Sequence, residues 1–213
     1  MTQFPERLLS GYGRFMDGSY RAERDRYLEL ADRGQKPETL IISCCDSRAA
    51  PETIFNCGPG ELFVIRNVAN LVPAYAEGGD PFSTAAAMEF SILALKIKDI
   101  VVMGHGRCGG ISAALDTGME PLSPDNFVGR WIEPLAPLSE QVRNKEDLSA
   151  AERQTALERV SIYNSIRNLR SYPYIKALEE KGDVTLHGAW FDISSGELWV
   201  MDTATGDFSR PGQ

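Results

Sequence analysis

Two short stretches of the sequence carry side chains suited to holding a metal ion. His105 and Cys108 stand three residues apart in VMGHGRCGG, and Cys44 and Asp46 stand two residues apart in SCCDSR. Imidazole nitrogen and thiolate sulfur are ligands that Zn²⁺ prefers in proteins. Two cysteines and one histidine leave a fourth coordination position open, which is typical of a catalytic zinc site rather than a structural one. The sequence therefore predicts a metal site built from Cys44, His105 and Cys108.

The first stretch also fits a different pattern. Gly104, Gly106 and Gly109 match G-x-G-x-x-G, the turn that holds the phosphates of a dinucleotide. That fingerprint requires a second strand and an acidic residue about 20 positions further on. Residues 121–138 are rich in proline and predict no such strand. The metal site is the better interpretation.

Both stretches follow predicted strands. Residues 39–43 and 99–103 are short apolar runs typical of buried strands, and residues 83–98 between them are rich in helix formers. A strand, a helix and a second strand in succession predict parallel pairing. In open α/β sheets the functional crevice lies outside the carboxyl ends of the strands. We therefore expect Cys44 and His105 to meet at that edge of the sheet.

Periodicity and turn residues predict the rest of the fold. The further segments are two amphipathic helices within 6–33, a strand at 62–65, a helix opening in 109–118, a long amphipathic helix at about 150–170, and a strand with a hairpin in 183–202. The expected fold class is α/β, with a central, mostly parallel sheet flanked by helices and an N-terminal helical arm. We expect one domain over residues 1–213, with the arm in residues 1–34 and the core in residues 35–213.

Composition and charge narrow the class of protein. With 213 residues, of which 43% are hydrophobic, the chain can bury one good core. The formal net charge of -8 argues against a nucleic-acid partner, because such proteins neutralise phosphates with lysine and arginine. The sequence has neither an apolar run near 18 residues nor a recognisable signal peptide, so we expect a cytoplasmic protein without a membrane partner. Its four cysteines favour metal or redox chemistry over a disulfide framework.

The motif C-x-D-S-R followed by H-x-x-C-G-G resembles that of the β-class carbonic anhydrases, in particular the plant-type members with an open active site. The resemblance covers most of the chain, including PGELFVIRNVANLVP, LRSYPYI and TLHGAWFDISSGELW. It implies a lyase that reversibly hydrates carbon dioxide to bicarbonate and a proton. It also implies one Zn²⁺ per chain, held by Cys44, His105 and Cys108.

The resemblance assigns roles to further residues. Zinc lowers the pKa of a bound water from ~15.7 to about 7, and the resulting hydroxide is the nucleophile. In the family, a pair such as Asp46 and Arg48 keeps the aspartate off the metal and lets it accept the hydroxide's proton. The residues placed around the substrate are Gln35, Phe63, Val68, Phe90 and Gly109. Phe90 stands where similar plant-type enzymes carry tyrosine, and Arg107 brings a second cation near the metal.

A homodimer or a larger homo-oligomer is also implied, in which both chains line each pocket and the N-terminal arm wraps the partner. Family members with an inhibitory bicarbonate pocket build it from a tryptophan, an arginine and a tyrosine. The corresponding residues here are Ile41, Arg66 and Phe191, so only the arginine remains. Hydrocarbon side chains leave the oxygens of a buried anion unpaired. We therefore expect no such regulation and a site that stays open at neutral pH.

Two other functions use the same residues. Relatives of this fold hydrolyse carbon disulfide or carbonyl sulfide on the same kind of zinc site. A non-catalytic zinc or redox module would make use of the adjacent thiols of Cys44 and Cys45, although a structural zinc has no need of an Asp–Arg pair. Three residues are predicted to be structural, with Cys45 in the core, Cys57 in a loop and His187 in a strand.

Overall fold

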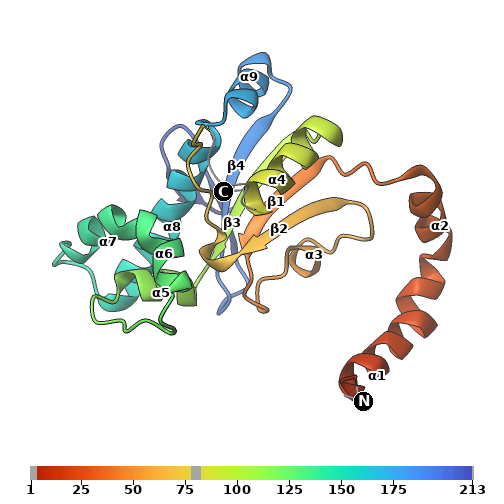
Figure 1. Ribbon diagram of the computed structural model, residues 1–213, viewed down its shortest axis with the longest axis horizontal. Helices are drawn as coiled ribbons and strands as arrows, with labels where there is room; N and C mark the ends of the chain where they lie inside the picture. Colours follow the sequence, from red (N-terminus) through yellow and green to blue (C-terminus); the bar gives the residue numbers. More distant parts are fainter. Residues whose placement is uncertain (1–3, 78–82, 213) are drawn as a thin grey trace.

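A single six-stranded sheet organises the chain in the computed structural model, which describes residues 4–77 and 83–212 (Figure 1). The strands are β1 (Thr39–Cys44), β2 (Leu62–Asn67), β3 (Asp99–His105), β4 (Thr185–Phe191), β5 (Leu198–Met201) and β6 (Phe208–Ser209). Their order across the sheet is β2-β1-β3-β4-β5-β6. The first four strands in this order pair in parallel, and β5 and β6 are antiparallel additions. The predicted mostly parallel sheet is confirmed, together with the hairpin between β4 and β5.

Helices connect the strands and flank the sheet. The α-helices are α1 (Glu6–Phe15), α2 (Arg24–Arg33), α3 (Pro51–Ile54), α4 (Ser83–Glu89), α5 (Gly109–Leu115), α6 (Phe127–Ile132), α7 (Ala136–Arg143), α8 (Ala150–Leu169) and α9 (Pro173–Lys181). Short π-helical segments follow α1 and α4 at Met16–Tyr20 and Phe90–Ala94, and 3₁₀ turns lie at Val68–Asn70 and Glu133–Leu135. The longest helix, α8, begins with a capping box, in which Ser149 and Glu152 satisfy each other's backbone amides.

The two faces of the sheet have different covers. In β1, Leu40 and Ile42 point into the main core, which also contains buried residues of α8 and α9. Ile41 points to the other face, where Met103 of β3 and Ile54 of α3 form a smaller cluster. This alternation follows from the strand period of two residues. The main core holds β3 and β4 against α8 and so fixes the strand ends that carry the site.

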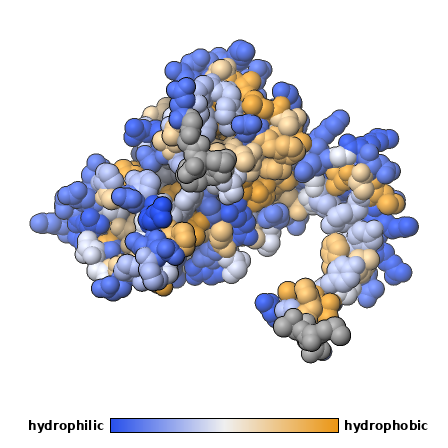
Figure 2. All heavy atoms as spheres, viewed as in Figure 1, coloured by the Kyte–Doolittle hydropathy of each residue, from blue (hydrophilic) through white to orange (hydrophobic). Residues whose placement is uncertain are grey.

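The helices α1 and α2 form an arm that extends away from the sheet (Figure 1). No residue of either helix is buried. Figure 2 shows hydrophobic residues at the surface of the arm. Phe4, Leu8, Leu9 and Tyr12 are exposed in this segment. The predicted N-terminal helical arm is confirmed, and this apolar face stays uncovered within the described part of the chain.

Of the helices within residues 4–77 and 83–212, none has the length and apolar character needed to cross a membrane. The cytoplasmic location and the assignment of residues 1–213 to one domain stay predictions.

Candidate metal centre and active site

Three candidate ligands meet at the carboxyl edge of the parallel sheet. Cys44 is the last residue of β1 and His105 is the last residue of β3, while Cys108 lies in the turn that leads into α5. Because β1 and β3 pair directly in parallel, their ends lie side by side. The ligand atoms of the three residues all lie within 4.8 Å of one another, and the two sulfurs are 3.9 Å apart. This group of buried side chains could hold a metal ion.

The hydrogen bonding of His105 leaves one ring nitrogen free for a metal. Its Nδ1 lies 2.9 Å from the carbonyl oxygen of Gly106, and because a carbonyl only accepts, Nδ1 carries the proton. The other nitrogen, Nε2, is buried and has no hydrogen-bond partner. Burial would lower the pKa of the imidazole, but the nearby Cys44 sulfur and the Gly106 carbonyl outweigh burial and raise it. An unpartnered, buried Nε2 facing two sulfurs is the arrangement that a metal ion would satisfy.

The two buried thiols influence each other strongly. A hydrogen bond from the Cys108 thiol lowers the pKa of Cys44 to about 4. The same contact, together with burial, raises the pKa of Cys108. Cys44 is therefore the thiol of the pair that ionises more readily, and a bound cation would favour the thiolate form of both, since the thiolate is the ligand form of cysteine.

Asp46 and Arg48 form a bidentate pair beside the ligands. Arg48 donates from Nε to Asp46 Oδ1 at 2.9 Å and from Nη2 to Oδ2 at 2.7 Å. The guanidinium holds the pKa of the Asp46 carboxyl well below its usual range, so the group is ionised at neutral pH. Asp46 Oδ2 lies 3.9 Å from His105 Nε2. A carboxylate is thus held next to the ligand atoms while both of its oxygens bind arginine.

Arginine side chains also hold the backbone of the two ligand loops. Arg66 of β2 donates to the carbonyl oxygens of Cys44 at 2.8 Å and Asp46 at 2.6 Å. Arg48 donates a further bond to the carbonyl of Arg107 at 3.3 Å, which links the first ligand loop to the second. The guanidinium of Arg66 is therefore engaged with the loop that carries Cys44.

Glu158 of α8 is a buried polar residue at the site that the sequence analysis missed. It is 2% exposed, and its Oε1 accepts a hydrogen bond from the backbone amide of Cys108 at 3.0 Å. The available signal was its spacing, because Glu158 precedes the buried Ser161, Ile162 and Ser165 at helical intervals of three, four and seven residues. A charged residue on the buried side of an amphipathic helix has a specific hydrogen-bonding role more often than not.

The structure divides the predicted substrate residues into two groups. Val68 follows the end of β2 and Gly109 follows Cys108, so both lie at the edge that carries the ligands. Phe63, which belongs to the second group, pairs with Leu40. Leu40 lies near the start of β1, four residues before Cys44. At about 3.3 Å per residue, this places Phe63 roughly 13 Å along the sheet from the ligand end.

The second group lies toward the opposite edge of the sheet. The Phe90 ring lies 6.1 Å from that of Phe63, and Phe90 is 52% exposed. Gln35 is exposed in the segment before β1. One chain therefore brings together the ligands, Val68 and Gly109, but it does not bring Gln35, Phe63 and Phe90 to them.

Of the three residues predicted to be structural, Cys45 is the one that the structure contradicts. It is exposed, because β1 ends at Cys44 and the strand alternation does not continue into the bend that follows. Cys57 is half-buried in the loop before β2. His187 lies in β4, and its Nε2 contacts Asp99 Oδ1 at 2.9 Å.

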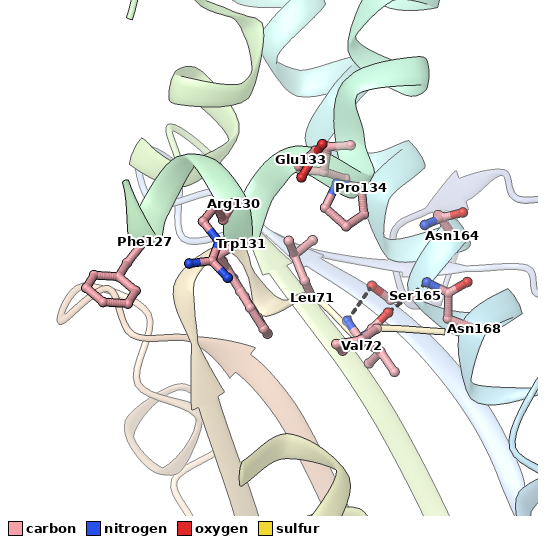
Figure 3. A pocket seen from close by; sticks show the side chains of 12 residues that line it. Leu71, Val72, Phe127, Arg130, Trp131, Glu133, Pro134, Asn164, Ser165 and Asn168 are labelled. Carbon is pink, nitrogen blue, oxygen red and sulfur yellow. Dashed lines mark hydrogen bonds between the residues drawn. The ribbon is translucent and has the colours of Figure 1, made fainter. Parts of the chain in front are cut away.

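A separate cavity of about 440 Å³ lies between α6, α8 and the segment after β2 (Figure 3). At its floor the Val72 amide donates to Ser165 Oγ at 3.2 Å and Asn168 Nδ2 donates to the Val72 carbonyl at 2.7 Å. Leu71, at the cavity wall, also belongs to the apolar cluster that contains Cys44. The lining of this cavity includes none of the predicted ligands or substrate residues, so the cavity is distinct from the candidate site.

The sequence is similar to those of known carbonic anhydrases. A model of the carbonic anhydrase family matches residues 39–198. The chain is 34% identical over 205 residues to beta carbonic anhydrase 3 of Arabidopsis thaliana, covering 94% of this chain and 78% of the relative. It is 35% identical over 201 residues to a carbonic anhydrase of Pseudomonas aeruginosa, covering 94% and 89%.

Solved structures give the same family. The β-carbonic anhydrase CcaA matches with a TM-score of 0.88 at 33% identity, over 98% of this chain and 92% of that one. A structure from a study of two tetrameric β-carbonic anhydrases of Sordaria macrospora matches with a TM-score of 0.81 at 28% identity, over 96% and 98%. The sequence comparison and the structure comparison thus find relatives of the same family.

Proposed function

Because the chain belongs to the β-carbonic anhydrase family of enzymes, we propose that it catalyses the reversible hydration of carbon dioxide to bicarbonate and a proton. The observation that carries the proposal is the Asp46–Arg48 pair beside the Cys44, His105 and Cys108 cluster. A structural metal site has no use for an ionised carboxylate held off the metal. This argues against the alternative of a non-catalytic zinc or redox module.

The proposed cofactor is one Zn²⁺ per chain, held by Cys44, His105 and Cys108. Two sulfurs and an unprotonated imidazole nitrogen suit this ion, and the set leaves a fourth position open. When bound, zinc acts as a Lewis acid and supplies hydroxide at neutral pH by lowering the pKa of its water to about 7. Gly106 fixes the His105 tautomer, so that Nε2 faces the ion without a proton.

Asp46 is proposed to accept a proton and to orient the nucleophile. Arg48 holds both carboxylate oxygens and so restrains Asp46 from turning to the metal and filling the fourth position. The carboxylate nevertheless remains close to the ligand atoms, since Oδ2 lies 3.9 Å from His105 Nε2. Arg48 is thus a positioning residue, and Asp46 is the catalytic residue that faces the reacting atoms. Hydrolysis of carbon disulfide or carbonyl sulfide has no specific support among the described residues.

We propose that the active site is completed by a second copy of the chain. Gln35, Phe63 and Phe90 lie toward the far edge of the sheet from Cys44, so they serve the substrate pocket only as residues of a partner. The uncovered apolar face of the arm supplies a surface for the same association. A homodimer is the smallest assembly that meets both requirements.

Stopped-flow measurement of carbon dioxide hydration, with metal analysis and light scattering on the same sample, tests the proposal. We expect turnover, one zinc per chain and a dimer or larger oligomer. A zinc-loaded protein without carbon dioxide turnover would overturn the proposed reaction. An active monomer would instead overturn the shared pocket.

A further inference from the structure

A buried hydrogen-bond cluster lies beneath the ligand Cys108. At its centre is Glu158 of α8, whose Oε1 accepts from the Cys108 amide at 3.0 Å and from Gln154 Nε2 at 3.1 Å. Its Oε2 accepts from the indole N–H of Trp190 at 3.0 Å. Within residues 4–77 and 83–212, Glu158 takes part in no salt bridge. Neutral N–H groups alone therefore satisfy this carboxyl group, and one of them belongs to a metal ligand.

Gln154 contacts the backbone of the same residue. One helical turn before Glu158, its Nε2 donates to the carbonyl oxygen of Cys108 at 3.3 Å as well as to Glu158. Glu158 binds the N–H of Cys108 and Gln154 binds its C=O. Residues four apart on a helix lie on the same face, so α8 contacts this one residue through two adjacent side chains.

The turn that carries Cys108 requires such support. Arg107, immediately before it, has φ of 58°, a left-handed conformation that disfavours residues with a side chain. Strained residues persist only where the surrounding structure holds them. Cys108 is also the N-cap residue of α5, but its side chain makes no capping bond, because the sulfur points to the site. The turn therefore relies on contacts from outside itself. The Gly106 amide donates to the Phe191 carbonyl, and Arg48 donates to the Arg107 carbonyl. Glu158 and Gln154 of α8 add a clamp on the backbone of Cys108.

We propose that Glu158 and Gln154 are positioning residues that fix the sulfur of Cys108 for metal binding. This inference rests on the proposed zinc site and adds two residues of α8 to its supporting structure. A carboxylate suits the position because it only accepts, and it meets donors on both sides. A glutamine at 158 would place its NH₂ group against the N–H of either Cys108 or Trp190, whichever way the amide turned.

The test compares zinc affinity in Glu158→Gln, Trp190→Phe and the double variant, by competition with a chromophoric chelator. Loss of a residue that supports a metal ligand costs roughly 10- to 100-fold in affinity, which is the loss expected for Glu158→Gln. The double variant removes the donor that the new NH₂ group would face and is expected to regain most of that affinity. Cobalt substitution reports the geometry directly, because the visible bands of Co²⁺ change with its coordination. We expect altered bands in Glu158→Gln and near-normal bands in the double variant.

A matched control separates positioning from general destabilisation. Ile166→Ala deletes a fully buried side chain of the same helix, in the main core and away from Cys108. At comparable loss of thermal stability it should leave zinc affinity and the cobalt spectrum unchanged. Equal zinc affinity in Glu158→Gln and wild type would overturn the clamp, and so would an equal loss in Ile166→Ala.

Two further outcomes are covered by the same set of proteins. If the Glu158 variants do not fold, the zinc affinity of Gln154→Leu tests the proposal instead. Gln154 is only partly buried, so this substitution should allow folding. A several-fold weaker zinc affinity supports the clamp, and an unchanged affinity overturns it. A wild-type protein that binds no zinc refutes the proposed metal site itself, which distinguishes that failure from failure of the clamp.

Discussion

Replacing Asp46 with asparagine is expected to remove catalysis without removing zinc. Asp46 Oδ1 accepts the backbone N–H of Arg48 at 2.9 Å, and an asparagine oxygen makes the same turn. The substitution therefore preserves the loop and removes no ligand atom. The asparagine oxygen can still accept from Arg48 Nε, but the amide NH₂ stands where Asp46 Oδ2 accepted from Nη2, so that bond is lost together with the negative charge of the carboxylate.

The magnitude follows from the role of a positioned proton acceptor. Such groups contribute about 10²- to 10⁴-fold to rate. At 1.36 kcal/mol per decade this corresponds to roughly 2.7–5.4 kcal/mol of activation free energy. Arg48 keeps the pKa of Asp46 far below neutrality, so the carboxylate is charged throughout an assay from pH 6 to pH 9. We therefore expect kcat/KM of Asp46→Asn to fall about 100-fold or more, by the same factor across that range.

Stopped-flow assays at several pH values, paired with zinc analysis, measure this effect. Asp202→Asn is the matched control, because Asp202 Oδ1 makes the same turn contact with the Ala204 amide at 2.8 Å. It follows Met201 of β5, which pairs with Gly188 in the middle of β4, and so lies away from the strand end that carries His105. The control should keep its full rate. An Asp46→Asn protein with normal zinc and normal turnover would refute the role of Asp46, whereas loss of zinc would make Asp46 a ligand.

Three further predictions concern the metal, the assembly and the fold. Cys108→Ser should lose most of its zinc in metal analysis, while Cys57→Ser, in a loop outside the ligand cluster, should retain it. Leu9→Glu places a charge on the apolar face of the arm. We expect a smaller assembly by light scattering and a lower turnover per chain, and an unchanged assembly would exclude this face from the interface. Ser149→Ala should lower the free energy of unfolding at pH 7 by about 1 kcal/mol through loss of the α8 cap. Ser149 lowers the pKa of Glu152, so the Glu152 carboxylate stabilises the fold above about pH 4 and loses this effect as acid protonates it. Urea unfolding should therefore show a smaller difference in unfolding free energy between Ser149→Ala and wild type at pH 3 than at pH 7.

The cluster of Cys44, His105 and Cys108 was predictable chiefly from sheet topology and the short spacing of His105 and Cys108. Parallel pairing of β1 and β3 brings Cys44 and His105 to one edge, and the pairing itself follows from the strand, helix, strand succession. The bidentate contact of Asp46 and Arg48 was equally accessible, since the two residues are two positions apart and form their own turn.

Residues whose role depends on distant contacts were not predictable in the same way. Glu158 lies 50 positions from Cys108, and only the packing of α8 on β3 and β4 brings it under the ligand. The exposure of Cys45 depends on where β1 ends, and one residue decides between core and surface.

Four helices were also missed for a local reason. The sequence analysis assigned no helix to α3, α6, α7 or α9, and prolines lie in or next to these short segments. In α3, α7 and α9 a proline stands in the first turn of the helix, where its missing N–H costs no hydrogen bond. A proline at the start of a short segment is thus compatible with a helix.

The contact between Trp190 and Glu158 makes the fluorescence of this indole sensitive to changes at Cys108. The Trp190 indole is 5% exposed, and the guanidinium of Arg159 lies 4.6 Å from its ring and 4.7 Å from that of Trp199. Indole emission responds to nearby charge and to the partner of its N–H group. Glu158 binds this N–H and the amide of Cys108 with its two oxygens, so a displacement of the ligand turn changes the surroundings of the fluorophore. Intrinsic fluorescence should thus follow events at Cys108 in the unmodified protein, in real time and without an added dye.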